Sequence, residues 1–273
     1  MRVAIQGQRG SFHDEAAGKF FASDFTVVPC YSFAAVFLAL RDGRADFGVV
    51  AVENSLYGSL HETYDQLLRS RFTIIGEVAL QIQQCLIARP GATLSCITTV
   101  MSHPAALDQC REFLARELPH AQLIEHADTA GAVAELTGLP ATTAAIASRH
   151  AAQLHQMAVL AEDIADEPDN VTRFIVLSPR PKQIDGANKA SLIITTQHQP
   201  GALHQALGII SQNNCNMTKI ESRPVRGQPF RYQFIIDIMA SQAQLISVCH
   251  ELEQSGCSVT VLGHYCADTS SPK

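Results

Sequence analysis

A threonine, an arginine and a phenylalanine stand together at Thr172, Arg173 and Phe174, where a strand-like segment begins. A hydroxyl donates a hydrogen bond that strengthens as negative charge grows on the acceptor oxygen, so Thr172 is suited to polarising a leaving group. The planar guanidinium of Arg173 can bind a carboxylate through two hydrogen bonds. Phe174 would form an apolar wall beside them or belong to the core. Taken alone, a Thr-Arg pair that opens a strand is an ordinary feature of β structure.

More polar residues follow the continuous apolar run at 47–52, which is typical of a strand covered on both faces. Glu53, Asn54 and Ser55 come directly after it, at the carboxyl end of the strand, where the ligands of open α/β sheets gather. We expect Asn54 and Ser55 to donate hydrogen bonds to a substrate. An ionised Glu53 would repel an anionic substrate, so we expect its side chain to support Asn54 and Ser55 from the side away from the substrate. The alternative for this tripeptide is a plain turn.

Three further candidates stand at expected helix starts. Ser11 lies in a glycine-bounded turn, where it would cap a helix beside backbone N–H groups that bind anions. Thr129 follows Asp128 at a second helix start, where it either contacts a substrate or takes part in capping. His103 precedes a third helix. A histidine near a cleft can act as an acid, but a hinge or packing role is the simpler interpretation here.

Composition excludes several classes of protein. Of the 273 residues, 47% are hydrophobic and 17% are charged, which is typical of a folded enzyme rather than a disordered chain. A formal net charge of -6 without a basic cluster argues against nucleic-acid binding, and it leaves the capture of an anionic substrate to local donors. The 11 histidines lack metal-ligand spacing and no phosphate-binding glycine motif is present. We therefore predict no metal, no nucleotide and no other cofactor.

The sequence also bears on the cellular compartment. No segment approaches the roughly 20 apolar residues of a membrane span, and the N-terminus lacks the apolar core of a signal peptide. The eight cysteines are scattered without a Cys-x-x-Cys pair, as expected of reduced thiols inside a cell. We predict a cytoplasmic protein without disulfides or structural zinc.

Strand-like and helix-like segments alternate over the first 178 residues, which predicts an α/β layer architecture. The long β-rich segment at 72–88 would carry the chain from the first lobe to a second one, and the strand at 172–177 would return it to the first. This path predicts two lobes with a cleft between them. After a polar linker, the order strand, helix, strand, strand, helix, strand predicts an α+β ferredoxin-like domain. The predicted parts are a first lobe at about 1–80 and 160–178, a second lobe at about 81–159, a linker at 179–188, the ferredoxin-like domain at 189–266 and a tail at 267–273.

Four segments together resemble the prephenate dehydratase family, in the order that this family shows. They are residues 7–13 (Gly-Gln-Arg-Gly-Ser-Phe-His), 52–55 with Gly58 (Val-Glu-Asn-Ser), 102–104 with Gln109 and Cys110 (Ser-His-Pro), and 169–174 (Asp-Asn-Val-Thr-Arg-Phe). Gln8 and His13 depart from the Pro and Ser that the family often has. Residues 200–203 (Pro-Gly-Ala-Leu) and 220–224 (Ile-Glu-Ser-Arg-Pro) resemble the two effector-site motifs of ACT domains attached to such dehydratases.

The resemblance implies a two-lobed, periplasmic-binding-protein-like catalytic domain that converts prephenate to phenylpyruvate, carbon dioxide and water in phenylalanine biosynthesis. Loss of carbon dioxide from the ring supplies the electrons and aromatisation supplies the driving force, so no electron-sink cofactor is needed. Thr172 would contact the departing hydroxyl. The resemblance and the placement above give Thr172, Arg173, Asn54 and Ser55 as catalytic residues, and Ser11, Glu53, Phe174 and Thr129 as substrate-binding residues.

In the ACT domain the resemblance implies a site for L-phenylalanine. The residues expected to form it are Gly201, Ala202, Leu203, Asn216, Glu221, Ser222 and Arg223. The helix start at Gly201 would offer backbone N–H groups to the effector carboxylate, while the second motif would approach across a subunit interface. We therefore expect a homodimer or homotetramer that assembles through ACT domains. Phenylalanine would inhibit if it favours a state with a closed or misaligned cleft. The alternative is a dimerisation module without a ligand.

Two other functions stay open. Arogenate dehydratase performs the same elimination on the transaminated substrate, and the sequence does not place the residues that would distinguish a keto group from an ammonium. A non-enzymatic amino-acid sensor is also consistent with the two predicted domains, although a sensor needs no leaving-group donor such as Thr172. Because the first strand begins at residue 2, without a preceding helical mutase segment, we expect a monofunctional dehydratase.

Overall fold

The computed structural model of the chain describes residues 1–22, 24–225 and 227–268. These residues form two compact units. The first comprises Met1–Ser70 and Val78–Phe174, and the second comprises Arg71–Glu77 and the described residues from Ile175 to Asp268. No helix within the described ranges is both long enough and apolar enough to cross a membrane.

One sheet is mainly N-terminal and has the strand order β2-β1-β3-β11-β5, with a short strand β4 paired to β3. It belongs to the first unit except for residues 73–77 of β5 and 175–178 of β11, which belong to the second. Its strands are β1 (Arg2–Gln6), β2 (Thr26–Cys30), β3 (Phe47–Asn54), β4 (Gly58–Ser59), β5 (Thr73–Gln81) and β11 (Val171–Ser178). Strand β1 is parallel to both β2 and β3, so the carboxyl ends of β1 and β3 open on the same edge. Helices α1 (Phe12–Phe21), α2 (Phe33–Arg41) and α3 (His61–Leu67) follow these strands. The apolar run of β3 is buried, as its sequence predicted.

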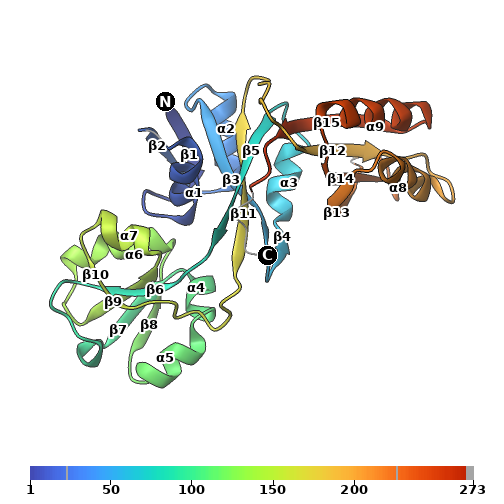
Figure 1. The fold of residues 1–273 in the computed structure, drawn as a ribbon. Helices are drawn as coiled ribbons and strands as arrows, with labels where there is room; N and C mark the ends of the chain where they lie inside the picture. Colours follow the sequence, from blue (N-terminus) through green and yellow to red (C-terminus); the bar gives the residue numbers. More distant parts are fainter. Residues whose placement is uncertain (23, 226, 269–273) are drawn as a thin grey trace. The chain divides into compact units, whose positions relative to one another are not determined.

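A second sheet lies in the same unit, set apart from the first one in Figure 1, with the order β10-β6-β9-β7-β8. Its elements are β6 (Cys85–Ala88), η1 (Leu94–Cys96), β7 (Thr99–Ser102), α4 (Pro104–Asp108), α5 (Arg111–Glu117), β8 (Gln122–Glu125), α6 (Thr129–Glu135), η2 (Leu136–Gly138), β9 (Thr143–Ala147), α7 (Arg149–Leu154) and β10 (Ala158–Ala161). Alternate residues of β9 pack on opposite faces: Ile146 contributes to a core with residues of α4 and α5, and Ala145 to a core with residues of α6 and α7. The two lobes that the sequence predicted are therefore present.

The helix that the sequence predicted after His103 is interrupted in the structure. The structure has two short helices, α4 and α5, that are separated at Gln109 and Cys110. Cys110 is fully buried with φ -121° and ψ 23°, outside the helical region. The Gln109 carbonyl accepts a hydrogen bond from the Asp166 N–H (2.7 Å), and the Glu112 N–H donates to the Asp166 carboxylate (3.1 Å). Asp166 thus satisfies backbone groups at the break.

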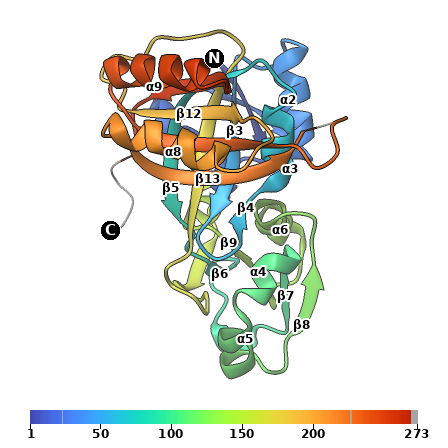
Figure 2. The same ribbon diagram turned by 90° about the vertical axis from the view of Figure 1, so that its right-hand side faces the viewer.

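The second unit contains the strand-helix-strand-strand-helix-strand order predicted for the C-terminal part. Its elements are β12 (Lys189–Thr195), α8 (Ala202–Gln212), β13 (Asn216–Pro224), β14 (Tyr232–Met239), α9 (Gln242–Gln254) and β15 (Ser258–Tyr265). The antiparallel sheet has the order β13-β14-β12-β15. Ala190, Leu192 and Ile194 alternate along β12 and pack against both helices, which lie on one face of the sheet (Figure 2). The ferredoxin-like prediction is confirmed.

Candidate active site and effector site

A cavity of about 350 Å³ in the first unit is lined by residues from both lobes. It takes Gln6 and Asn54 from the ends of β1 and β3, and His103 and Thr129 from the segments after β7 and β8. Carboxyl ends of strands are where open α/β sheets bind ligands. Its walls comprise Gln6, Gly7, Ser11, Phe12, His13, Phe33, Ala51, Asn54, Tyr57, Leu60, Ile82, Gln84, His103, Ala105, Ala106, Gln109, Ala127, Asp128, Thr129, Asn170, Thr172 and Phe174. Among these described residues, Asp128 is the one carboxylate and none is Lys or Arg.

Asn54 fixes the orientation of the Thr172 hydroxyl. The Asn54 Oδ1 atom accepts hydrogen bonds from the backbone N–H groups of Leu56 (3.0 Å) and Tyr57 (3.1 Å). Its Nδ2 atom must then face the other way, and it donates to Thr172 Oγ1 (2.9 Å) and to Asn170 Oδ1 (2.6 Å). Because Thr172 Oγ1 is an acceptor toward Asn54, its own hydrogen is directed elsewhere. Thr172 lines the cavity, so it can donate this hydrogen to a bound molecule.

Arg173 and Glu53 lie together but away from Thr172. Successive side chains of a strand point to opposite faces, so Arg173 is on the face of β11 opposite Thr172 and Phe174. Its Nε atom forms an ion pair with Glu53 Oε2 (3.2 Å), and its Nη2 atom donates to the Tyr64 hydroxyl (3.4 Å). Neither Arg173 nor Glu53 is among the described residues that line the cavity. The placement gives no support for Arg173 as a carboxylate clamp in this cavity.

Ser55 also lies outside the cavity lining, where it holds two segments together. Its Oγ donates to the Asp169 carbonyl (2.8 Å) and accepts from the Val171 N–H (2.9 Å). Its own N–H donates to the Val171 carbonyl (2.8 Å). These bonds join the turn after β3 to the start of β11, so Ser55 helps to set the position of Thr172 through the backbone.

Ser11 and Thr129 line the cavity as expected, each at a helix start. Ser11 caps α1: its side chain accepts from the Asp14 N–H at 3.3 Å. Thr129 is the first residue of α6, whose cap is Asp128, with Oδ1 accepting from the Gly131 N–H (2.6 Å). The first N–H groups of α1 have no partner inside the helix, so Ser11 stands beside donors suited to an anion.

His13 and Phe174 form an aromatic part of the wall. Their rings meet edge to face with centroids 4.9 Å apart, and His13 Nε2 accepts from the Ala51 N–H (3.3 Å). Burial lowers the pKa of His13 to about 3, so the imidazole is neutral at pH 7. His103 also lines the cavity, and its Nδ1 caps α4 by accepting from the Ala105 N–H (3.2 Å).

Sequence reasoning gave no role to several polar residues of the cavity, among them Gln84, Gln109 and Tyr57. Gln84 is buried, and its Nε2 donates to Gln109 Oε1 at 3.1 Å. The Gln109 Nε2 atom lies 3.5 Å from the Tyr57 hydroxyl. Gln84 comes soon after the apolar strand β5, just as Asn54 ends the apolar strand β3. The same strand-end signal would therefore have identified Gln84.

The two lobes also meet beside the start of α1. Ser148 Oγ donates to the Gly10 carbonyl (2.9 Å), and His150 Nε2 lies 3.0 Å from Asp14 Oδ2. A side chain at Gly10 would begin 3.1 Å from Ala151 Cα, so the close approach of the two segments requires glycine there. The hydrogen bond to Asp14 raises the pKa of His150, and the bonds from His150 and Gly10 lower the pKa of Asp14 despite its burial.

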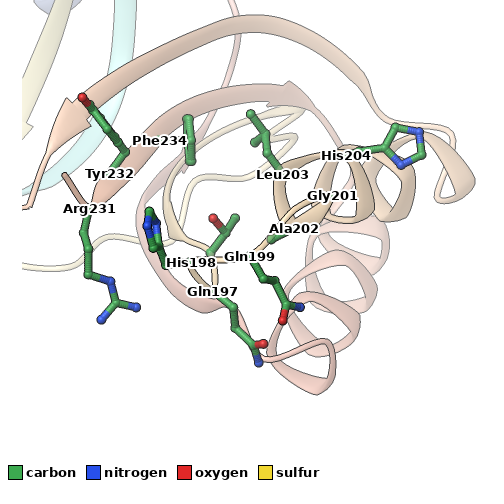
Figure 3. A pocket seen from close by; sticks show the side chains of 11 residues that line it. Gln197, His198, Gln199, Gly201, Ala202, Leu203, His204, Arg231, Tyr232 and Phe234 are labelled. Atoms are coloured by element: carbon green, nitrogen blue, oxygen red, sulfur yellow. The ribbon is translucent and has the colours of Figure 1, made fainter.

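The second unit has its own cavity, of about 330 Å³, at the start of α8. Gly201, Ala202 and Leu203 line it together with the preceding turn and the start of β14 (Figure 3). Gly201 has φ +82°, a conformation that favours glycine. The other predicted effector residues, namely Asn216, Glu221, Ser222 and Arg223, lie on the edge strand β13 and are not among the lining residues of a single chain. Their approach from another subunit stays a prediction.

Comparison with known families decides the assignment. The model of the prephenate dehydratase family matches residues 3–182, and the model of the ACT domain matches residues 190–245. The chain belongs to the prephenate dehydratase family. As a member of the prephenate dehydratase family it is a lyase, which excludes the non-enzymatic sensor, and its C-terminal ferredoxin-like domain is an ACT domain.

Two curated relatives show the breadth of the prephenate dehydratase family. The Arabidopsis thaliana protein named arogenate dehydratase/prephenate dehydratase 2, chloroplastic, is 38% identical over 99% of this chain and 74% of its own length. The bifunctional chorismate mutase/prephenate dehydratase of Aquifex aeolicus is 34% identical over 97% of this chain and 73% of its own length. The names of these relatives therefore include both substrates.

Two solved structures match nearly the whole chain. The prephenate dehydratase of Arthrobacter aurescens in complex with L-Phe has 31% identity and a TM-score of 0.85, covering 100% of this chain and 92% of the other. A protein described as GqqA, a novel type of quorum quenching acylase, has 29% identity and a TM-score of 0.85, covering 98% and 99%. The fold predicted from the family resemblance is thus confirmed over both domains.

Proposed function

We propose that this enzyme converts prephenate to phenylpyruvate, carbon dioxide and water, and that phenylalanine regulates it at the ACT domain. The hydrogen bond from Asn54 Nδ2 to Thr172 Oγ1 is the observation that carries the first part. It turns the Thr172 hydroxyl into a directed donor inside a cavity that suits a small molecule.

The reaction breaks two bonds of the prephenate ring. The bond between the ring and its carboxylate breaks, and the electron pair left on the ring shifts to complete the aromatic system. The bond between the ring and the hydroxyl then releases its pair to oxygen, which takes a proton and leaves as water. Negative charge thus grows on the departing oxygen, so a donor fixed beside it stabilises the transition state more than the ground state.

Neutral donors supply the substrate contacts. Since no Lys or Arg is among the described residues of the lining, the carboxylates of prephenate would be bound by hydrogen bonds from Ser11 and the first backbone N–H groups of α1. The ring would lie against His13 and Phe174, whose edge-to-face contact forms an apolar wall. A positive charge beside the ring carboxylate would stabilise the substrate before it loses carbon dioxide. Because His13 is neutral, it adds no such charge.

Two variants of Thr172 test this proposal. Thr172→Val keeps the shape of the side chain and removes the hydroxyl, so we expect kcat for prephenate to fall about 100-fold or more, the effect of removing one such donor. Thr172→Ser keeps the hydroxyl and should stay within about tenfold of the wild type. Phenylpyruvate formation is measured at about pH 8, where spontaneous acid-driven conversion is slow, against an enzyme-free control. Equal rates for the wild type and Thr172→Val would remove Thr172 from the mechanism.

Arogenate is the second candidate substrate, and one feature of the cavity favours it. Asp128 is the carboxylate of the described lining, and arogenate carries an ammonium where prephenate carries a keto group. The relatives named as arogenate dehydratases point the same way. We therefore propose a direct comparison of kcat/KM for both substrates in the wild type and in Asp128→Asn, which can still cap α6. A loss confined to arogenate would assign Asp128 to the ammonium, while equal values in both proteins would leave Asp128 as a cap.

Regulation rests on the cavity at Gly201. The Arthrobacter aurescens relative, solved in complex with L-Phe, supports phenylalanine as the effector. The substitution Gly201→Ala places a side chain where φ is +82°, so we expect phenylalanine binding, measured by calorimetry, to weaken about tenfold. The matched control is Gly208→Ala in the same helix, where an added Cβ meets nothing within 4 Å. Unchanged activity at saturating phenylalanine would refute the regulatory part alone.

The assembly and the compartment stay predictions. A homodimer or homotetramer through ACT domains would be seen by light scattering of the purified chain. The Arabidopsis relative is named as chloroplastic, so membership of the family does not by itself support the predicted cytoplasmic location.

A further inference from the structure

Asn170 stands next to the Asn54–Thr172 pair, and its two side-chain polar atoms differ in their hydrogen bonding. Its side chain is 1% exposed and lines the cavity. Its Oδ1 accepts from Asn54 Nδ2 at 2.6 Å, whereas its Nδ2 has no hydrogen-bond partner among the described residues. Native proteins rarely leave a buried donor unpaired, so this atom of the cavity lining is available to hydrogen bond to a bound molecule.

The assignment of the two Asn170 side-chain atoms follows from the network itself. Asn54 Oδ1 accepts from two backbone N–H groups, which makes the opposite atom of Asn54 a donor. The Asn170 atom that faces this donor must be an acceptor, and it is therefore Oδ1. The amide nitrogen of Asn170 is then the atom that remains uncommitted. The same donor also holds Thr172 Oγ1, so Asn170 and Thr172 are oriented by one side chain.

We propose that Asn170 is a second catalytic donor, whose Nδ2 group hydrogen bonds to the departing hydroxyl oxygen of the substrate beside Thr172. This inference rests on the proposed dehydration. Asn170 directly precedes β11 and Thr172 is the second residue of this strand. Both side chains line the cavity and accept from the same Asn54 Nδ2 atom, which places them close together. A hydroxide leaving from a ring develops a full charge, and two fixed donors stabilise it in the way that paired donors stabilise an oxyanion.

Three titratable groups of the cavity are unsuited to this task at the atoms whose partners are known. His13 is neutral, and its Nε2 is occupied by the Ala51 N–H. His103 Nδ1 is occupied by the Ala105 N–H. Asp128 as a carboxylate can only accept hydrogen bonds. Neither histidine nor the aspartate therefore offers an acid at these atoms.

Two variants separate a donor from a residue that only positions Asn54. Asn170→Ala removes both side-chain polar atoms, yet Asn54 keeps its bonds to Leu56, Tyr57 and Thr172. Asn170→Asp keeps the acceptor toward Asn54 and removes the donor. We expect both variants to lose about 100-fold or more in kcat. The inhibition constant of phenylpyruvate, which lacks the hydroxyl, should stay within about threefold in Asn170→Ala, and its binding also shows that the cavity is folded.

The wild type is measured first, with prephenate and with arogenate. If it turns over neither substrate, the proposed function fails and the variants are not interpreted. If it turns over one of them, the variants decide on Asn170 alone. A kcat for Asn170→Ala within threefold of the wild type would overturn the proposal. So would an active Asn170→Asp beside an inactive Asn170→Ala, or a loss in Asn170→Ala that appears only in KM and in the phenylpyruvate constant.

Discussion

Asn54 and Thr172 are 118 residues apart in the sequence, and a hydrogen bond of 2.9 Å from Asn54 Nδ2 joins them in the cavity. The bond has a direction, because Asn54 Oδ1 is occupied by two backbone N–H groups. Thr172 must accept from Asn54, and its own proton is left for the substrate. The arrangement turns a poor acid into an oriented donor, which is what the departure of hydroxide requires.

The first prediction reverses this direction. In Asn54→Asp the new carboxylate can only accept hydrogen bonds, so the Thr172 hydroxyl would donate to it and turn away from the substrate. We expect kcat for prephenate to fall about 100-fold although Thr172 is intact. Steady-state kinetics at pH 8 measure the effect, and phenylalanine binding to the ACT domain controls for folding. Retention of more than about a third of the wild-type kcat would show that the direction of this bond is unimportant.

The second prediction concerns Arg173, which the sequence interpretation placed at the substrate. Its ion pair with Glu53 and its position opposite Thr172 indicate a structural role. In the double variant Arg173→Met/Glu53→Gln we expect KM for prephenate to stay within about threefold of the wild type, with a lower melting temperature. Removing both charges avoids leaving Glu53 unpaired. A rise in KM of about 100-fold would restore Arg173 as a carboxylate clamp, because a lost charged pair costs roughly that much.

Several parts of the site could be predicted from sequence because local rules govern them. Asn54 ends a buried strand and Ser11 precedes a helix, and both line the cavity. The role of Arg173 at the substrate stays a prediction that the placement does not support, since neighbours on a strand point to opposite faces and Arg173 lies opposite Thr172. Ser55 was not predictable in the same way, because its partners at Asp169 and Val171 are more than 100 residues away and only the fold brings them together.

The third prediction concerns the dependence of stability on pH. The pKa of His13 is lowered from 6.5 to about 3 by burial, so below pH 6.5 the unfolded chain binds a proton that the folded chain does not. This histidine therefore reduces the free energy of unfolding progressively as the pH falls from about 6.5. The substitution His13→Gln removes this titration. When the pH is lowered from 7 to 5, we expect the free energy of unfolding of the variant to fall by about 1–2 kcal/mol less than that of the wild type.

His150 provides the control of opposite sign. Its pKa is raised by Asp14, so its contribution is fully present below the ordinary value of 6.5 and is lost as the pH rises through the folded value. The pKa of Asp14 is lowered, so its own contribution is lost as the pH falls below the ordinary value of 3.8. His150→Gln should therefore destabilise the protein at pH 5.5 more than at pH 8.5. Chemical denaturation at several pH values measures both variants, and parallel curves for all three proteins would contradict these assignments.

The last prediction concerns a buried ion pair within the second unit. Lys189 Nζ lies 2.9 and 2.8 Å from the two carboxylate oxygens of Glu77, and the side chains are only 9% and 4% exposed. Glu77 belongs to β5 and Lys189 opens β12, the first strand of the ACT domain. Removing one partner leaves a buried charge, so we expect Lys189→Met to lower the free energy of unfolding by about 3–5 kcal/mol.

The double variant Lys189→Met/Glu77→Met removes both charges and should recover most of this loss, because apolar side chains of similar size can replace a buried pair at little cost. An exposed pair is the matched control. Arg111→Met breaks the pair with Asp108, whose side chains are 74% and 61% exposed, and should change stability by less than about 1 kcal/mol. Denaturant titrations of the wild type and the three variants give the free energies of unfolding. If Lys189→Met is no more harmful than Arg111→Met, the ion pair between Lys189 and Glu77 contributes no more to stability than an exposed pair does.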